Sequence, residues 1–192
     1  MTNKERFIAI CEANIKREGI QELLAWLETS DFYTAPASTK FHGNFEGGLV
    51  EHSLNVYDNL IKVMKITGFE KMFNIETVAV VGLFHDLCKT NYYKKGFRNV
   101  KDEFSGAWVK KEIYEVSEKL PLGHGEKSCI ILQNFLKLTA EELLAIRWHM
   151  GGWDSSSRGG EHGMGAAQDY TPLVTLTQTA DMLATLMEEK RD

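Results

Sequence analysis

The stretch VGLFHDLCK, residues 81–89, ends an apolar helix-like run with an adjacent histidine and aspartate, His85 and Asp86. Neighbouring residues on a helix point about 100° apart, so these two side chains can share an ion only if it lies between them at the helix end. Taken alone, such a pair is more often a helix cap or a hydrogen-bonded surface pair. Its meaning therefore depends on where the other histidines fall.

Three more histidines and one aspartate lie in or beside predicted helices. His52 stands near the start of an amphipathic run whose apolar residues recur at helical spacing, and His124 lies in a glycine-flanked loop before a helix predicted to begin near Glu126. His149 ends another run, and the glycines after it indicate a helix stop. Asp181 falls inside an apolar helix, where a carboxylate that faces the core needs a partner.

The pattern of apolar residues predicts an all-α protein. A first helix is capped by Thr2 with Glu5 as its capping-box partner, and a second run follows Gly19. We expect residues 1–35 to form a helical hairpin packed on the core, and residues 36–192 to form one compact domain. The further helices are predicted at about 48–66, 75–88, 126–137, 140–150 and 172–188, the fourth of them opened by a capping box from Thr139 to Glu142.

One segment breaks the helical pattern. Near residues 92–116, aromatic and β-branched residues alternate with charged ones around turn-forming residues, which predicts an inserted β-hairpin. Residues 89–111 carry seven lysines and arginines against two acids, in a chain whose net charge is −5. The hairpin can bind phosphate through its cations and a base by stacking on its aromatic rings. Lys94, Lys95 and Arg98 are candidate substrate contacts. Alternatively, its lysines only keep an exposed edge soluble.

A second irregular segment runs from Gly151 to Asp169 and is long for a loop, which indicates a lid or a substrate loop. His162 lies in it. We interpret His162 as a loop histidine near the pocket rather than a ligand, and we expect His42 to contact substrate or to support a metal ligand.

Size and composition are those of one soluble domain. The chain has 192 residues, of which 43% are hydrophobic and 26% charged, and its pI of about 5.7 argues against a general nucleic-acid coat. No apolar run approaches the ~18 residues of a membrane helix, and the first residues do not resemble a signal peptide. We therefore expect a cytoplasmic protein without a membrane partner. Three cysteines without CxxC spacing favour a structural role for the thiols.

The order His52, His85-Asp86, His124, His149, Asp181 resembles the HD-domain metal-dependent phosphohydrolase superfamily. The motifs GGLVEHSLNV, VGLFHDLCK, LGHGEKS, RWHMG and TPLVTLTQTADMLA are similar to the HD domain of YhaM-type 3′–5′ exoribonucleases and of related phage-type HD proteins. The resemblance covers roughly Pro36 to Glu188. It implies an HD-domain helical bundle over residues 36–192.

The resemblance also implies roles for single residues. His52, His85 and Asp181 would hold one divalent ion, Asp86 would bridge, and His124 and His149 would hold a second. Lys89 matches the lysine of the family's HDxxK pattern and would neutralise phosphate charge during the reaction, although a solvated helix-end cation is the alternative. Ligands of this kind suit Mn²⁺, Fe²⁺, Co²⁺, Ni²⁺, Zn²⁺ or Mg²⁺.

We therefore expect a hydrolase that cleaves a phosphoester of a nucleotide or short nucleic acid through a metal-activated water, with Asp86 and Lys89 as catalytic residues. The alternative is a non-catalytic module that binds a nucleotide or holds a metal for stability. The chain has one basic segment and an acidic remainder, so mononucleotides or short oligomers are expected in preference to long RNA or duplex DNA. No protein partner can be inferred.

Overall fold

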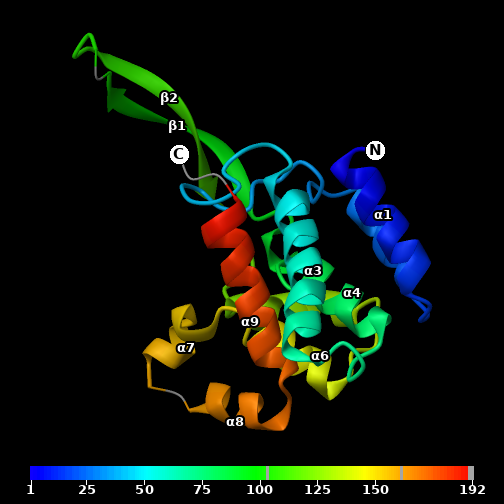
Figure 1. Ribbon diagram of the computed structural model, residues 1–192. Coiled ribbons are helices and arrows are strands. Elements are labelled where there is room, and N and C mark those ends of the chain that lie inside the picture. The colour runs from blue at the N-terminus through cyan, green and yellow to red at the C-terminus, as the bar shows by residue number, and fades with distance from the viewer. Residues whose placement is uncertain (103, 161, 190–192) are drawn as a thin grey trace.

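The computed structural model describes residues 1–102, 104–160 and 162–189, and its helices pack around a central pair, α3 (Gly48–Thr67) and α4 (Ile75–Phe84) (Figure 1). In α3 the buried side chains follow helical spacing and form one apolar face. In α4 every residue from Thr77 to Phe84 is buried, so this helix is surrounded by the others. His85 and Asp86 directly follow this central helix.

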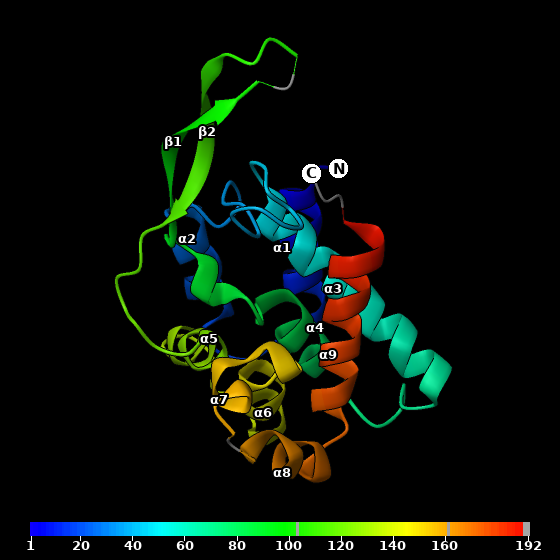
Figure 2. The same cartoon turned by 90° about the vertical axis from the view of Figure 1, so that its left-hand side faces the viewer.

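The other helices cover this pair. α9 lies along α3, α5 and α6 pack on one another, and α6 contacts both α4 and α9 (Figures 1 and 2). Both predicted capping boxes, at Thr2 and at Thr139, are present. The bounds of these helices are α1 (Asn3–Asn14), α2 (Ile20–Glu28), α5 (His124–Gln133), α6 (Ala140–Arg147), α7 (Ser155–Arg158), α8 (Gly163–Tyr170) and α9 (Leu173–Leu183), with a π-helical turn at Ala184–Glu188 after α9.

The N-terminal helices share the main hydrophobic core. Phe7 of α1 lies edge-on to Phe84 of α4, with ring centroids 5.5 Å apart, and packs on Phe32 at 5.1 Å. Arg17, between α1 and α2, reaches the buried carboxylate of Glu142 in α6 at 2.8 Å. No helix within the described residues has both the length and the apolar character needed to cross a membrane.

The predicted β-hairpin is confirmed. β1 (Tyr93–Lys101) and β2 (Trp108–Val116) pair antiparallel and project from the helical body as a two-stranded arm (Figures 1 and 2). Asp102 closes the turn, because its carboxylate accepts hydrogen bonds from the backbone N–H and the hydroxyl of Ser105 at 2.7 Å. The fold class, an all-α bundle with an inserted hairpin, is therefore as the sequence predicts.

Several local predictions are wrong. His124 is the first residue of α5 rather than part of a loop, and the helices expected to end at 137 and 150 end at Gln133 and Arg147. The helix expected over 75–88 ends at Phe84, and a short 3-10 turn, Leu87–Lys89, follows the His-Asp pair. The described part of the segment 151–169 is not an open loop, since α7 and α8 lie within it. The reason is a small second apolar cluster in which Ala167 of α8 packs against Trp148 and Val174.

Candidate metal centre

The carboxylate of Asp86 lies at the centre of a cluster that five parts of the chain build. Its Oδ1 atom is 2.8 Å from Nε2 of His124 and 3.4 Å from Nε2 of His149. Its Oδ2 atom is 3.4 Å from Nε2 of His52 and 3.6 Å from Nε2 of His85. The two oxygens of one carboxylate thus face two different pairs of imidazoles.

Asp181 completes the cluster from α9. Its Oδ1 atom lies 3.4 Å from Nε2 of His52, and it forms a compact group with His85 and His149. The structure therefore brings together all six residues that the sequence assigned to metal: His52, His85, Asp86, His124, His149 and Asp181.

Hydrogen bonds at the far side of three rings aim Nε2 into the cluster. Nδ1 of His85 lies 3.0 Å from the carbonyl oxygen of Gly82, and Nδ1 of His149 lies 2.7 Å from that of Ile146. Since a carbonyl can only accept, Nδ1 must carry the proton in both rings, which leaves Nε2 free to ligate. Nδ1 of His52 lies 2.9 Å from a carboxylate oxygen of Glu189, so the same arrangement is available there.

Two glycines allow the helices that carry these residues to approach closely. A Cβ atom on Gly82 would lie 2.8 Å from Cα of Tyr57, so α4 can lie against α3 only with glycine at this position. A Cβ atom on Gly125 would lie 2.1 Å from the carbonyl oxygen of Arg147. This second contact holds the start of α5 against the end of α6, and it explains how His124 and His149 meet.

The cluster keeps Asp86 ionised. Burial alone would raise the pKa of Asp86, but Lys89 and the surrounding histidines hold it well below its usual range. The Lys89 ammonium is itself buried and lies 2.6 Å from Oδ2 of Asp86. The alternative interpretation of Lys89 as a solvated helix-end cation is therefore wrong.

The imidazoles differ from one another in how readily they are protonated. Burial lowers the pKa of His85 to about 3, so that ring is neutral at pH 7. Burial would also lower the pKa of His52, but hydrogen bonds to Asp86 and Glu189 raise it to about 10. A ring so strongly held by two carboxylates sits in an environment that favours positive charge, which is what a cation site requires.

The donor set fits a divalent transition metal. Four groups of side chains among the described residues each place their ligand atoms within 4.8 Å of one another: His52 with His85 and Asp86, His85 with His149 and Asp181, Asp86 with His124 and His149, and, at the edge, His42 with His52 and Glu189. Nε2 of His149 is buried without a hydrogen-bond partner, and Nε2 of His52 and of His85 face each other at 3.1 Å. Ions held by these groups would satisfy these nitrogen atoms, and an imidazole-rich set leans toward transition metals.

Two of the six side chains are partly exposed to solvent. The side chain of His124 is 28% exposed and that of Asp181 is 15% exposed, whereas those of His52, His85, Asp86 and His149 are almost completely buried. Cys88 lies beside His124, with its sulfur 3.4 Å from Nδ1 of that ring, but burial raises the pKa of this thiol to about 12. It therefore stays protonated at neutral pH, as expected for a structural cysteine.

The remaining candidates from the sequence fall outside the cluster of six. The ring of His42 lies 5.0 Å from that of His52, at the edge of the centre, and burial lowers its pKa to about 4. His162 is exposed at the start of α8 and joins none of the ligand groups found among the described residues. Lys94, Lys95 and Arg98 lie on the exposed hairpin.

Glu189 is a site residue that sequence reasoning missed. Its carboxylate contacts His52 at 2.9 Å and also accepts a hydrogen bond from the amide nitrogen of Asn55 at 3.2 Å. In the sequence it is one of several charged residues after an apolar helix, a pattern that is typical of a solvated helix end. Nothing in the local pattern marks it as part of the site.

Residues 49–186 match the family model described as the HD domain. Because this match covers well over half of the chain, the protein belongs to the HD domain family, whose members are generally metal-dependent hydrolases. Comparisons with curated proteins and with solved structures find no significant match.

Proposed function

We propose that this protein is a metal-dependent phosphohydrolase that cleaves a phosphoester of a nucleotide or short nucleic acid. The observation that carries the proposal is the division of Asp86, whose Oδ1 faces His124 and His149 while its Oδ2 faces His52 and His85. A carboxylate shared in this way is suited to bridge two ions. The motif order shared with YhaM-type exoribonucleases supports a phosphodiester as the substrate.

In this proposal His52, His85 and Asp181 would hold one divalent ion, His124 and His149 would hold the other, and Asp86 would serve both. When bound, such ions acidify water and withdraw negative charge from phosphoryl oxygens. The exposed flank at His124 and Asp181 is the side from which a phosphate can enter.

The chain's own groups prepare the site for a phosphate. Lys89 balances the charge of Asp86 at 2.6 Å, and its ammonium is held in place by burial. A fixed cation that needs no rearrangement stabilises negative charge that develops on phosphorus oxygens. His42, at the edge of the centre and without a hydrogen-bond partner for either ring nitrogen in the described structure, is positioned to contact the substrate.

The decisive experiment removes the shared carboxylate. Asp86→Ala is expected to abolish both metal retention and cleavage in a screen of mononucleotides, cyclic dinucleotides and RNA oligomers with Mn²⁺ or Ni²⁺. Asp58→Ala is a matched control, because Asp58 pairs with Arg6 on a partly exposed surface and should leave both properties unchanged. Full metal content together with full activity in Asp86→Ala would overturn the proposal.

The same screen separates the proposal from a non-catalytic module. If the unaltered protein binds nucleotides tightly but cleaves none of the substrates with any metal, the pocket serves for binding alone. Metal content should be measured by mass spectrometry in the same samples, so that a failure to load metal is distinguished from a failure of chemistry.

A further inference from the structure

The two faces of the β-hairpin differ in chemistry. Residues directly opposite one another in an antiparallel pair share a face, and alternate residues along a strand point to the same side. The register pairs Lys95 with Tyr114, Phe97 with Glu112 and Lys101 with Trp108. The odd-numbered residues of β1 and the even-numbered residues of β2 therefore form one face, which we call the aromatic face because it carries all four aromatic side chains of the two strands.

On the aromatic face, exposed rings are interspersed with lysines and with one acid, Glu112, which pairs with Lys95 at 3.3 Å. Phe97 is 58% exposed and Trp108 is 72% exposed. The Lys110 ammonium lies 4.3 Å from the centre of the Phe97 ring, and Lys101 is the direct neighbour of Trp108 across the sheet. Large exposed rings on a projecting arm mark a binding surface more often than a structural one.

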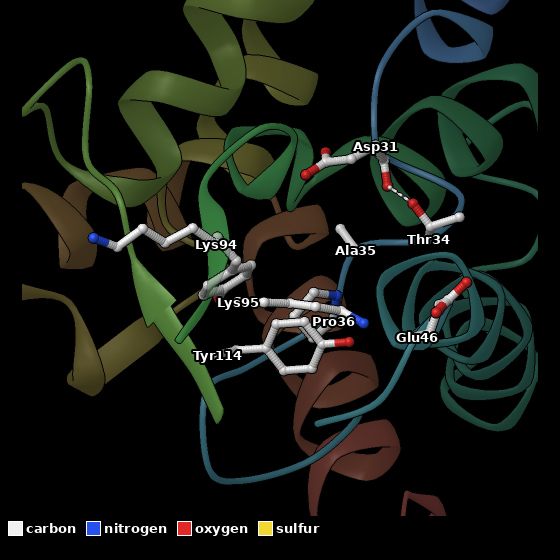
Figure 3. A pocket seen from close by; sticks show the side chains of 9 residues that line it. Asp31, Thr34, Ala35, Pro36, Glu46, Lys94, Lys95 and Tyr114 are labelled. Atoms are coloured by element: carbon white, nitrogen blue, oxygen red, sulfur yellow. Dashed lines mark hydrogen bonds between the residues drawn. The ribbon is translucent and has the colours of Figure 1, made fainter. Parts of the chain in front are cut away.

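The base of the aromatic face closes over a cavity of about 250 Å³. In Figure 3 the side chains of Lys95 and Tyr114 extend across Pro36 toward Glu46, while Lys94, from the opposite face, points away. The cavity is somewhat smaller than the ~300–1,000 Å³ of pockets for drug-sized ligands, so it suits one ring system. Pro36 and Tyr114 offer flat surfaces, Lys95 offers a cation, and Glu46 and Asp31 offer carboxylates. This combination suits a nucleobase.

A short loop links this cavity to the metal centre. The Tyr93 hydroxyl donates to the carbonyl oxygen of Ala37 at 3.3 Å, and Pro36 and Tyr93 both line the cavity. The same loop continues to His42, whose ring lies 5.0 Å from that of His52 in the metal centre. The loop that carries Pro36 and Ala37 therefore connects the cavity at the base of the aromatic face with His42 at the edge of the metal centre.

We propose that the aromatic face and its cavity bind a single-stranded oligonucleotide, with bases stacked on the exposed rings and phosphates held by the intervening lysines. Single strands fit because every base offers a face for stacking, whereas the faces of the bases in a duplex are already stacked on neighbouring base pairs. A nine-residue strand spans about 30 Å, which allows a few nucleotides. The step that follows at the metal centre rests on the proposed function, but the binding itself does not.

Charge favours this occupant over a second copy of the chain. The hairpin segment is basic, and a polyanion complements it. Lysines on both strands, among them Lys94, Lys95, Lys110 and Lys111, disfavour the edge-to-edge strand pairing by which two hairpins would associate.

The test measures binding of a fluorescent octamer of single-stranded RNA, and of DNA with the same sequence, by anisotropy. EDTA in all samples prevents metal-dependent cleavage, so the outcome does not depend on the proposed function. The double variant Phe97→Ala, Trp108→Ala is expected to weaken binding at least tenfold. The matched control Val100→Ala, Val109→Ala removes a cross-strand pair from the opposite face and should change binding less than twofold.

A second comparison separates the lysines by face. Lys95→Ala together with Lys110→Ala should reduce the slope of log affinity against log salt by about 2. Lys94→Ala together with Lys111→Ala, on the opposite face, should have a smaller effect. Thermal melting confirms that each variant folds.

Three results would overturn the proposal: equal losses from the two faces, duplex binding as tight as single-strand binding, or a dimer in sedimentation that Phe97→Ala, Trp108→Ala converts to a monomer. The last result would assign the face to a second copy of the chain. If the octamer binds as expected but no metal supports cleavage, the binding inference stands and the proposed function fails. If mononucleotides are cleaved but the octamer does not bind, the proposed function stands and the binding inference fails.

Discussion

Asp86 contacts four imidazoles and one ammonium, and the way these contacts are divided decides how many ions the centre can hold. A mononuclear centre needs only His52, His85, Asp86 and Asp181. His124 and His149 would then be substrate contacts. Their shared position at Oδ1 of Asp86 favours a second ion instead.

The number of ions can be tested by removing the Oδ1 partners. We expect His124→Ala and His149→Ala each to reduce bound metal from two ions toward one and to lower the rate of cleavage by about 100-fold or more, as loss of a charge-stabilising group does. Metal analysis during mild chelation should show stepwise loss in the unaltered protein and a single step in the variants. Unchanged stoichiometry and rate would mean a mononuclear centre.

Glu189 is expected to strengthen metal binding by orienting His52. Its carboxylate accepts from Nδ1 of that ring at 2.9 Å, and carboxylates in this position raise the basicity of the ligating nitrogen. Glu189→Gln keeps the size of the side chain but removes its charge. Metal affinity should fall about tenfold, at the low end of the range for such supporting groups.

The neighbouring Glu188 provides the control for this prediction. Its carboxylate bonds with Asn59 at 2.8 Å and with Lys62 at 3.3 Å and does not contact His52. Glu188→Gln should therefore leave metal affinity unchanged. The affinities can be measured by Co²⁺ titration, and the Co²⁺ absorption spectrum should shift in Glu189→Gln alone. An unshifted spectrum with unchanged affinity would show that Glu189 is not a positioning residue.

At the scale of elements, an ion pair fixes the segment that follows α6. Arg147, the last residue of α6, bonds with the buried carboxylate of Asp154 at 3.0 Å, and Asp154 caps α7 by accepting from the N–H of Ser156. Burial would raise the pKa of Asp154, but Arg147 and the backbone N–H groups lower it. The ion pair thus fixes the segment between His149 and α7 against the end of α6.

Asp154→Asn is expected to lower the free energy of unfolding by about 1–3 kcal/mol at pH 7, because the partly buried Arg147 loses one of its two carboxylate partners and keeps only Glu126, at 2.6 Å. The folded pKa of Asp154 lies below the unfolded value of about 3.9, so its contribution is present above that pH and is lost as the pH falls through the folded pKa. Urea unfolding at pH 7 and pH 3 should show a smaller difference at pH 3. Equal differences at both values would contradict an ionic origin.

The elements also show where local pattern is a good guide. The helices, both capping boxes and the hairpin could be predicted, because periodicity, caps and turn residues act over a few neighbouring positions. The sequence predicts too late an end for α4, since His85 and Asp86 have no helix-breaking residue beside them. The helix ends where Asp86 contacts histidines from other elements, which local pattern does not record.

At the scale of the whole molecule, Arg17 ties the N-terminal helices to α6. Its guanidinium makes two bonds, of 2.8 and 2.9 Å, to the carboxylate of Glu142, which is 0% exposed. Glu142 also accepts from the hydroxyl of Thr77 in α4 at 3.0 Å. One carboxylate therefore joins three parts of the chain.

Removal of Arg17 leaves this carboxylate buried without a counter-charge. We expect Arg17→Ala to lower the free energy of unfolding by about 3–5 kcal/mol. Arg6→Ala is the control, because Arg6 also makes two bonds to a carboxylate, that of Asp58, but on a partly exposed surface where such pairs contribute about 0–1 kcal/mol. Urea denaturation of both variants measures the difference. Equal losses of unfolding free energy in Arg17→Ala and Arg6→Ala would contradict the role of burial.

Helical spacing and strand alternation are local marks, so the helical class and the inserted hairpin follow from the sequence, and the six residues that meet at the candidate centre follow from the resemblance of their order to that of HD domains. The folded chain alone shows how the two oxygens of Asp86 are shared, that Glu189 contacts His52, and that the rings of the hairpin lie on the face beside the cavity. These features depend on contacts between residues far apart in the chain and on strand register. Spacing along the sequence carries no record of such contacts, since packing of the whole molecule creates them.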